Sequence, residues 1–328
     1  MKAYIIGGSG YTGGELLRIL LNHPKVSDIT VTSRKQAGQP VSSIHPHLPD
    51  DIKFSDYDKN EAVSSDIVFT CVPHTTAMDT IPEIAGKTKI VDLSADYRLK
   101  DAATYERYYK AKHKDPQRLT TAVYGMPELH REEIKKADLV ANPGCFPTAI
   151  IPPAKVLKDE FKAKYINADA KTGVSGAGAE PKADTHFPTI NDNIIPYKTV
   201  GHQHTPEIQQ EAGAHILFTP HLVPLTRGIL ATIYALIDAD AETVTNAMKK
   251  AYGKEPFVVV RNTVPSLLAV RGSNYIHMGG AASAEGRVVI FSAIDNLTKG
   301  ASSQAVQNMN LMLGYKETDG IRQLGLSP

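Results

Sequence analysis

A glycine-rich loop close to the start of the chain constrains the fold more than any other feature of this sequence. It spans Gly7–Gly14, follows a short apolar segment at Ala3–Ile6, and leads directly into a helical pattern over Glu15–Leu21. Read from Gly8, the loop has the spacing G-x-G-x-x-G, in which glycines let backbone N–H groups and a helix N-terminus approach a pyrophosphate. The strand–loop–helix context favours a dinucleotide-binding site over an ordinary glycine-rich turn. The residues expected to contact the dinucleotide are Gly8, Ser9, Gly10, Tyr11, Thr12 and Gly13.

The residues that follow the second predicted strand, Ile29–Thr32, favour NADP(H) over NAD(H). An Asp or Glu at this point would accept a hydrogen bond from the ribose 2′-OH, whereas an Arg accommodates a 2′-phosphate. This chain has Ser33, Arg34, Lys35 and Gln36 here, and none of them is acidic. A guanidinium suits a phosphate dianion, so we expect Arg34 to bind the 2′-phosphate and all four residues to contact the cofactor. The alternative is that Arg34 and Lys35 belong to a solvated turn.

The first half of the chain alternates short apolar runs with helical patterns, which is the signature of a parallel sheet built from βαβ units. Asp66–Val72 and Lys89–Leu93 are continuous apolar runs, as expected for strands that are covered on both faces. The pattern of Gly300–Met312 is helical again and is expected to pack back on this part. The sequence therefore predicts a Rossmann-type, NADP-binding α/β domain made of residues 1–144 and the C-terminal segment 300–328.

The second half of the chain has a different character. Ile229–Ile237, Phe257–Arg261 and Arg287–Ile294 are rich in β-branched and aromatic residues, and fewer helical patterns separate them. This pattern predicts a mixed or antiparallel sheet. Residues 145–299 are therefore expected to form an α+β domain, which would contain the candidate catalytic and substrate-binding residues described below.

The charge balance argues against polyanionic partners. The chain has 36 Lys+Arg and 35 Asp+Glu, for a formal net charge of +1, and so provides no basic field for nucleic acid or a membrane surface. No segment approaches the length of about 18 uninterrupted apolar residues that a membrane span requires. The two cysteines, Cys71 and Cys145, fit a reducing compartment. We therefore expect a cytoplasmic protein that binds neither nucleic acid nor membranes.

Cys145 is a candidate nucleophile. It follows Asn142–Gly144 at the expected start of a helix, just beyond a predicted short strand. Backbone N–H groups at a helix N-terminus favour a thiolate, and the carboxyl end of a strand is the usual ligand position in an α/β sheet. Pro152 and Pro153 are expected to kink or end this helix. Cys71 lies within an apolar strand and is interpreted as a buried side chain.

A thiolate nucleophile needs a partner that handles protons, and the segment His202-Gln203-His204 is the richest candidate. Two histidines one residue apart can also bind a metal ion. Two further ligands would then be needed, and no C-x-x-C or H-E-x-x-H motif accompanies them. The sequence therefore predicts no metal site, and solvent-facing loop histidines are the plain alternative.

Three further segments contain candidate ligand contacts. Ser175 and Gly176 lie in a glycine-rich segment that could bring backbone close to a ligand or form a flexible turn. Arg227 lies between apolar flanks, where it is either paired structurally or clamps a carboxylate or phosphate. Asn296 lies between a strand and the last helix, where it could reach a carboxamide or belong to a plain N-cap region. The cofactor contacts expected in this half are Ser175, Gly176 and Asn296.

Eight motifs spread over nearly the whole chain are each weak alone but highly specific together. They are Gly8–Gly13 (GSGYTG), Val91–Leu99 (VDLSADYRL), Val123–Leu129 (VYGMPEL), Ala141–Cys145 (ANPGC), Gly173–Gly178 (GVSGAG), Gly201–Glu207 (GHQHTPE), Phe218–Pro224 (FTPHLVP) and Asp295–Ala301 (DNLTKGA). In this order they resemble the N-acetyl-γ-glutamyl-phosphate reductases, an arginine-biosynthesis family related to the aspartate-semialdehyde dehydrogenases.

The resemblance implies an enzyme that reduces a small-molecule acyl phosphate with NADPH. By that likeness, Cys145 attacks the acyl phosphate and expels phosphate, and hydride converts the resulting thioester to a thiohemiacetal that collapses to a semialdehyde. His204 would be the acid/base. The implied substrate contacts are Asn142, His202 and Arg227, the last because this chain has Gln203 where the family usually has an Arg. Related enzymes pair through the sheet of the second domain, which implies a homodimer or homotetramer.

Three alternatives stay open at this level. A related class reduces the same kind of acyl phosphate while the substrate is attached to an acidic carrier protein. A non-catalytic NADPH-binding regulator could keep the fold, although Cys145 and His204 together argue against it. A metal-dependent hydrolase could use His202 and His204 as ligands.

Overall fold

The computed structural model describes residues 1–327, which divide into two compact units. Unit 1 comprises Met1–Pro143 and Ala301–Arg322. Unit 2 comprises Gly144–Gly300 and, within the described residues, 323–327.

The last described residues differ from expectation, because the sequence groups all of 300–328 with the first domain. Residues 323–327 belong to unit 2, where the N–H of Leu326 donates to the carbonyl of Arg271 (2.8 Å). Gly325 also packs so closely on Ala269 that an added Cβ would lie 2.0 Å from its carbonyl oxygen.

Unit 1 is built on a six-stranded sheet in which every pairing is parallel, with the order β2-β1-β3-β4-β6-β5. The predicted Rossmann-type sheet is thereby confirmed. The strands are β1 (Lys2–Ile6), β2 (Asp28–Thr32), β3 (Ile67–Thr70), β4 (Lys89–Asp92), β5 (Val123–Tyr124) and β6 (Leu139–Ala141). The helices are α1 (Tyr11–Leu20), α2 (Lys59–Ser64), α3 (Ala77–Ile84), α4 (Ala102–Tyr109), α5 (Pro127–Ile134) and α10 (Ser303–Met312).

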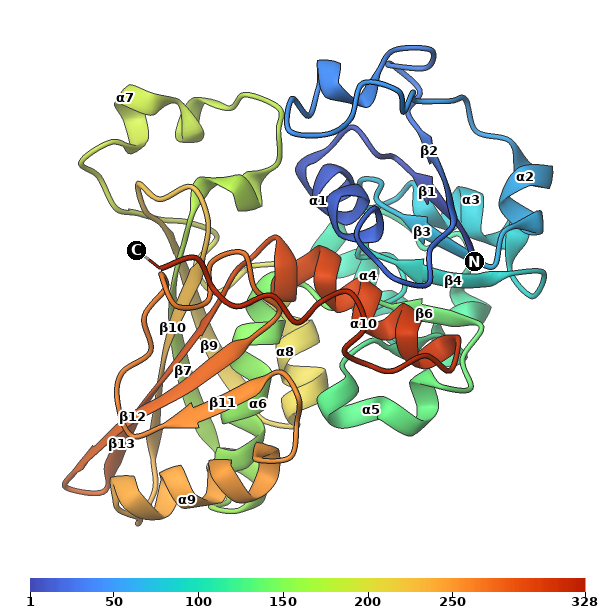
Figure 1. Ribbon diagram of the computed structural model, residues 1–328. Coiled ribbons are helices and arrows are strands. Elements are labelled where there is room, and N and C mark those ends of the chain that lie inside the picture. The colour runs from blue at the N-terminus through green and yellow to red at the C-terminus, as the bar shows by residue number, and fades with distance from the viewer. Residues whose placement is uncertain (328) are drawn as a thin grey trace. The chain divides into compact units, whose positions relative to one another are not determined.

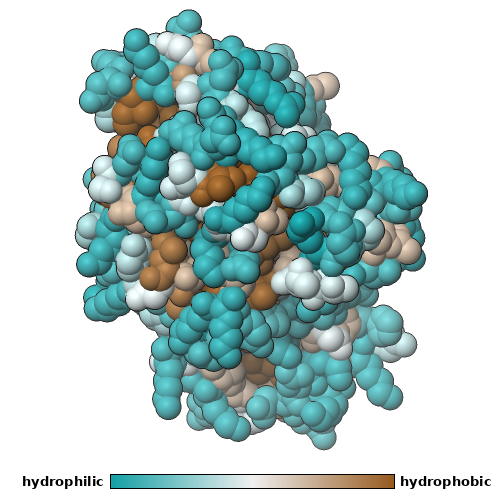
Figure 2. All heavy atoms as spheres, turned by 90° about the vertical axis from the view of Figure 1, so that its right-hand side faces the viewer, coloured by the Kyte–Doolittle hydropathy of each residue, from teal (hydrophilic) through white to brown (hydrophobic). Residues whose placement is uncertain are grey.

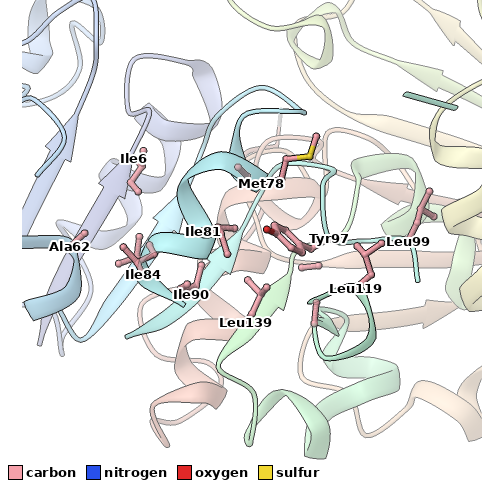
Figure 3. Packing of buried hydrophobic residues seen from close by; sticks show 14 of the residues in the cluster. Ile6, Ala62, Met78, Ile81, Ile84, Ile90, Tyr97, Leu99, Leu119 and Leu139 are labelled. Carbon is pink, nitrogen blue, oxygen red and sulfur yellow. The ribbon is translucent and has the colours of Figure 1, made fainter. Parts of the chain in front are cut away.

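Apolar side chains from both helices and strands form the core of unit 1. Ile81 and Ile84 of α3 are fully buried at helical spacing and lie close to Ile90 of β4 (Figure 3). Every residue of β3 is buried, as expected for a central parallel strand covered on both faces. Because β2 and β3 flank β1 on opposite sides, the strand order reverses there, and such a switch point is where doubly wound sheets bind ligands.

Unit 2 is built on a seven-stranded mixed sheet with the order β11-β12-β13-β10-β7-β9-β8, which confirms the predicted mixed sheet. The β7–β9 and β11–β12 pairs are parallel and the other pairs antiparallel. The strands are β7 (Tyr165–Thr172), β8 (Ile195–Pro196), β9 (His215–Leu222), β10 (Ile229–Leu236), β11 (Val258–Arg261), β12 (Ile276–Ala284) and β13 (Arg287–Ile294). The helices are α6 (Cys145–Asp159), α7 (Phe187–Ile190), α8 (His204–Ala212) and α9 (Ala241–Tyr252).

Helix α6 continues through Pro152 and Pro153 to Asp159, so of the expected kink or end at the prolines, the end does not occur. The prolines remove N–H donors from the helix. Most of α6 is buried, including both prolines, and we attribute its continuation to this apolar burial. Helices α6, α8 and α9 contact the strands of unit 2 (Figure 1).

The surface seen in Figure 2 is mostly hydrophilic, with small scattered hydrophobic spots. Among residues 1–327, no helix combines the length and the apolar composition that crossing a membrane would need.

Candidate active site

Cys145 is the first residue of α6, at the N-terminus of a 15-residue helix. The preceding residue, Gly144, has extended backbone (φ −69°, ψ 156°) and contributes no side-chain cap. The first N–H groups of a helix have no partner within the helix and stabilise negative charge. The predicted position of Cys145 at a helix start is therefore confirmed, and this position favours a thiolate.

Glycine at position 300 allows a close approach to Cys145. A Cβ added at Gly300 would lie 2.8 Å from the Cβ of Cys145 and 3.2 Å from the carbonyl oxygen of Asp295. Cβ atoms essentially never approach so closely, so any larger residue would displace the nucleophile.

The two candidate histidines lie at the start of α8, where His204 is the first helical residue. The backbone N–H of His204 donates to Nδ1 of His202 (3.0 Å), and the two ring centroids are 4.8 Å apart. The ring of Phe146, the neighbour of Cys145 in α6, lies 5.5 Å from that of His202 and 5.9 Å from that of His204. Contacts between α6 and α8 therefore bring the nucleophile and both histidines into one region of unit 2.

His202 is buried in an aromatic environment and is electrically neutral at ordinary pH. Its ring packs against Tyr197 (5.6 Å) and Phe218 (5.3 Å), and 6% of the residue is exposed. Burial, and then the positive charge of Lys198, lower the pKa of His202 to about 3. His202 is therefore a neutral imidazole whose Nδ1 accepts the backbone N–H of His204.

Tyr197 lies in the same region, although no sequence motif pointed to it. It follows β8, and its phenol is close enough to Cys145 for the two charges to interact. Burial, and then the negative charges of Cys145 and Asp184, raise the pKa of Tyr197. Tyr197 is therefore a protonated phenol, and a possible hydrogen-bond donor, beside the nucleophile.

Glu207 connects the two helices directly. Its Oε1 accepts a hydrogen bond from the backbone N–H of Gly144 (2.8 Å), and 1% of the residue is exposed. Glu207 lies three residues after His204 in α8, so both side chains project from neighbouring positions on one helix face. One turn of α8 thus carries the candidate acid/base and the group that holds the peptide before Cys145.

Arg227 forms an ion pair with Asp295. Its Nε lies 2.9 Å from Oδ2 of Asp295, which is fully buried. Asp295 also accepts hydrogen bonds from the backbone N–H groups of Gly272 (2.7 Å) and Leu297 (2.8 Å). This is the structural pairing that the sequence left open for Arg227, and its assignment as a substrate clamp stays a prediction.

The structure brings Ser175, Gly176 and Asn296 together in unit 2. Nδ2 of Asn296 donates to Oγ of Ser175 (3.0 Å), and its Oδ1 accepts from the N–H of Gly228 (2.7 Å). A Cβ added at Gly176 would lie 3.7 Å from Nδ2 of Asn296. Both ends of the Asn296 amide therefore have partners within the protein, and contact with a cofactor carboxamide stays a prediction.

The side chain of Asn142 forms hydrogen bonds to two other residues of unit 1. Nδ2 donates to the carbonyl of Ala301 (3.0 Å), and Oδ1 accepts from Nδ2 of Asn308 (3.0 Å). The Asn142 carbonyl accepts from Nε of Arg98 (2.7 Å). With 1% of the residue exposed, these contacts describe a structural role, and the predicted contact with substrate has no direct support.

The glycine loop of unit 1 has the close packing that a pyrophosphate cradle requires. Gly7 has φ +87°, which favours glycine, and a Cβ added at Gly8 would lie 2.1 Å from Cγ2 of Val31. A Cβ added at Gly13 would lie 2.6 Å from Cα of Gly8. Gly10 caps α1 without a side-chain hydrogen bond, so the first-turn N–H groups are suited to an anion. The predicted loop residues thus fit a dinucleotide.

The segment after β2 fits a 2′-phosphate. Oγ of the buried Ser33 donates to Oγ of Ser9 (3.1 Å), which ties this segment to the glycine loop. Arg34 and Lys35 are exposed, and Gln36 is partly buried. Arg34 forms no ion pair within the described part of the chain, so its guanidinium is accessible to a phosphate.

No group of three or more His, Cys, Asp or Glu side chains in residues 1–327 is placed to hold a metal ion. The metal-dependent hydrolase alternative therefore has no ligand set in this part of the chain.

Two family models match the chain, and together they cover most of it. The semialdehyde dehydrogenase NAD binding domain matches residues 2–137, and the semialdehyde dehydrogenase dimerisation domain matches residues 145–296. A Methanocaldococcus jannaschii protein named N-acetyl-gamma-glutamyl-phosphate reductase is 49% identical over 340 residues, covering 99% of this chain and 98% of that protein. A Methanosarcina acetivorans protein of the same name is 48% identical and covers 98% of both chains.

This chain belongs to the N-acetyl-γ-glutamyl-phosphate reductase family. Solved structures of more distant relatives share the fold. Aspartate semialdehyde dehydrogenase II from Vibrio cholerae has a TM-score of 0.72 at 19% identity, covering 95% of this chain and 98% of that one. The Candida albicans aspartate semialdehyde dehydrogenase with NADP has a TM-score of 0.71 at 16% identity, with the same coverage.

Glu207, Tyr197 and Gly300 are candidate site residues of this family member that reasoning from the sequence alone did not identify. The sequence contained a usable signal for Glu207, because this residue lies one helical turn after His204 in the segment that forms α8. Gly300 and Tyr197 carried no such signal. Their importance arises from proximity to Cys145, which lies 155 and 52 residues away in sequence (300 − 145 and 197 − 145).

Proposed function

We propose that this protein catalyses the NADPH-dependent reduction of N-acetyl-γ-glutamyl phosphate to N-acetyl-glutamate 5-semialdehyde and phosphate, a step of arginine biosynthesis. The observation that carries the proposal is that Cys145 and His204 begin two helices that contact each other, α6 and α8. The ring of Phe146, the neighbour of Cys145, lies 5.9 Å from that of His204. The names of relatives 49% and 48% identical to this chain support the acetylated substrate over a carrier-linked one.

The first half of the reaction is an acyl transfer to Cys145. The thiolate, stabilised by the α6 N-terminus, attacks the γ-carbonyl carbon. A C–S bond forms, the C–O bond to phosphate breaks, and phosphate leaves with its electron pair. Glu207 holds the Gly144 peptide in place during this step, because its Oε1 accepts the Gly144 N–H.

The second half releases the aldehyde. NADPH, when bound, supplies the hydride that reduces the thioester carbonyl. Cys145 then carries a thiohemiacetal, which collapses as the C–S bond breaks and the thiolate is restored. His204 provides the proton that the oxyanion needs and takes it back on collapse. His202, which is neutral, orients His204 by accepting its backbone N–H.

The residues that would hold the cofactor are those of the glycine loop, Gly8–Gly13, and of the segment Ser33–Gln36. The close packing of Gly8 and Gly13 leaves room for a pyrophosphate, and Arg34 offers a cation to the 2′-phosphate.

The test is the reverse reaction: phosphate-dependent reduction of NADP⁺ with N-acetyl-glutamate 5-semialdehyde, before and after treatment with iodoacetamide. Activity that requires phosphate and is lost on alkylation supports the proposal. Burial raises the pKa of Cys71, so the reagent should modify Cys145 selectively, and a Cys71→Ala variant provides the control. An enzyme that binds NADPH but shows no reverse activity would contradict the acetylated substrate and favour a carrier-linked one.

We also propose that the protein forms a homo-oligomer, with a homodimer as its basic unit. On the sheet of unit 2, Tyr165, Leu217, Tyr234 and Leu236 are all exposed, with exposed fractions from 42% to 73%. Strand pairing places them on one face, because Leu217 and Tyr234 both neighbour Asn167, and Tyr165 belongs to the same alternation. An apolar sheet face of this kind is suited to a second copy of the chain.

We propose a cytoplasmic location for the enzyme. The free thiol of Cys71 supports this, because reduced cysteines are typical of a reducing compartment.

A further inference from the structure

Lys198 and Gln203 form a contact that the proposed reaction does not yet use. Lys198 follows β8, and Gln203 precedes the first residue of α8. Nζ of Lys198 donates a hydrogen bond to Oε1 of Gln203 (2.6 Å). The side chain of Gln203 thus holds an ammonium group beside the N-terminus of α8.

Two lysines interact electrostatically here, and the carboxylate of Asp184 lies within electrostatic range of the neighbouring Tyr197. Partial burial, and then the positive charge of Lys182, lower the pKa of Lys198, so the two cations repel each other. Nζ of Lys182 donates to the carbonyl of Ala177 (2.8 Å). Within residues 1–327, neither Lys182 nor Lys198 forms an ion pair with an acidic side chain. An anion bound between them would relieve this repulsion.

The pair of lysines lies close to the reacting groups. Tyr197, the neighbour of Lys198, interacts electrostatically with Cys145, and its ring lies 5.6 Å from that of His202. The charge of Lys198 itself reaches His202. Gln203 makes no side-chain hydrogen bond to the first turn of α8, so the positive end of that nine-residue helix adds to the charge of the lysines.

We propose that Lys198, positioned by Gln203 and assisted by Lys182, binds the phosphate group of the acyl-phosphate substrate, and inorganic phosphate in the reverse reaction. This inference rests on the proposed function. A dianion matches two cations better than a carboxylate does, and an ammonium binds phosphate as a compact charge. Arg227, in contrast, is engaged with Asp295.

The first experiment measures Lys198→Met in the phosphate-dependent reduction of NADP⁺. Losing a charge-assisted hydrogen bond should raise the KM for inorganic phosphate by about tenfold or more, with the KM for the semialdehyde changed less than about twofold. Lys254→Met, which removes an exposed lysine after α9, is the matched control and should change neither value. A rise in the semialdehyde KM instead would assign Lys198 to the substrate carboxylate and overturn the proposal, as would no change in either.

A second variant tests whether the position of the charge matters. Because residue 203 contacts Nζ of Lys198, the double variant Lys198→Met/Gln203→Arg returns a cation to the same place. It should recover most of the phosphate affinity that Lys198→Met loses. Failure to recover it, with folding intact by circular dichroism, would count against a phosphate site at this position.

A third measurement does not depend on turnover. Inorganic phosphate should slow alkylation of Cys145 in the wild-type protein but not in Lys198→Met, with chloride at equal ionic strength as control. If phosphate slows alkylation in the wild type but not in Lys198→Met, and the wild type has no activity with the semialdehyde, the phosphate site is supported and the proposed substrate is rejected. Equal protection of wild type and variant, in an active enzyme, would reject the phosphate site while keeping the proposed function.

Discussion

Glu207 forms a hydrogen bond with the peptide N–H of Gly144, the residue before Cys145. Its carboxylate is buried and holds the Gly144 N–H at 2.8 Å, while the same turn of α8 begins with His204. Small displacements of a reacting group are costly to catalysis, because near-attack geometry is lost. Glu207 is therefore a positioning residue in our account.

We predict that Glu207→Ala lowers kcat by about tenfold to a hundredfold, because the Gly144 peptide is released. Glu207→Gln keeps an oxygen acceptor of the same length and should stay within a few-fold of wild type. The measurement is kcat and KM for both variants, with the rate of Cys145 alkylation as a second readout. If Gln and Ala impaired turnover equally, the hydrogen bond would not be what matters at this position.

The buried side chain of His202 makes the stability of the folded protein depend on pH. Its pKa in the folded protein is about 3, below the ordinary value of 6.5, so the unfolded chain takes up a proton that the folded protein excludes. Well above pH 6.5, His202 is neutral in both the folded and the unfolded state, so it no longer makes the free energy of unfolding depend on pH. As the pH falls from about 6.5 toward 3, His202 lowers the free energy of unfolding by up to about 1.4 kcal/mol per pH unit.

We predict that His202→Asn loses less stability than wild type between pH 7.5 and pH 5. Asn can still accept the N–H of His204 through Oδ1 but does not titrate. Urea denaturation at the two pH values measures the difference. Parallel losses in wild type and variant would contradict the buried, neutral state of His202.

At the scale of elements, we expect the end of β2 to determine which cofactor unit 1 accepts. The strand ends at Thr32, Ser33 ties the segment to the glycine loop, and Arg34 is exposed immediately afterwards. A strand end next to the glycine loop is where a dinucleotide-binding fold distinguishes a ribose hydroxyl from a phosphate.

We predict that Arg34→Ala raises the KM for NADPH by about tenfold to a hundredfold, since a charge-assisted hydrogen bond contributes about 1.5–3 kcal/mol. The KM for NADH should change little, because NADH has no 2′-phosphate. Steady-state kinetics with each cofactor provides the comparison. An equal effect on both would show that Arg34 does not contact the phosphate.

Element boundaries show where reasoning from sequence succeeds and where it fails. The predicted run Arg287–Ile294 coincides with β13, and Ile229–Ile237 contains β10, because alternating burial leaves a clear pattern. Of the two outcomes expected at Pro152 and Pro153, a kink or an end of the helix, the end is contradicted, because α6 continues to Asp159. A proline's local cost is readable from sequence, but the burial of the whole helix in unit 2 is not.

At the scale of the whole molecule, the exposed sheet face of unit 2 is the proposed surface of self-association. Leu217 and Leu236 are 50% and 72% exposed, and Tyr165 and Tyr234 lie on the same face. Large apolar side chains clustered on one face are costly to leave in water.

We predict that Leu217→Lys raises the dissociation constant of the homodimer by about thirtyfold or more. The substitution places a charge at the centre of the apolar face that the proposed dimer would bury. Leu324→Lys is the control, since Leu324 is 76% exposed but lies outside the sheet. Sedimentation equilibrium measures the mass of each variant. A Leu217→Lys protein that kept the wild-type mass would exclude this face as the interface.

The sequence by itself determined the parallel sheet of unit 1, the glycine loop between β1 and α1, and the position of Cys145 at a helix start. Each depends on residues close together along the chain: glycine spacing, apolar runs, or a cysteine at a helix start. Local patterns of this kind reflect backbone geometry, which neighbouring residues dictate.

Only the tertiary structure decided which distant groups serve the same site. Glu207 reaches Gly144 across 63 residues, and Arg227 is committed to Asp295 across 68. Gly300 packs against Cys145, although the motif that contains it, Asp295–Ala301, does not indicate this contact. The reason is physical: such contacts depend on how strands pair and helices pack, and long-range packing leaves no periodic signal in the sequence.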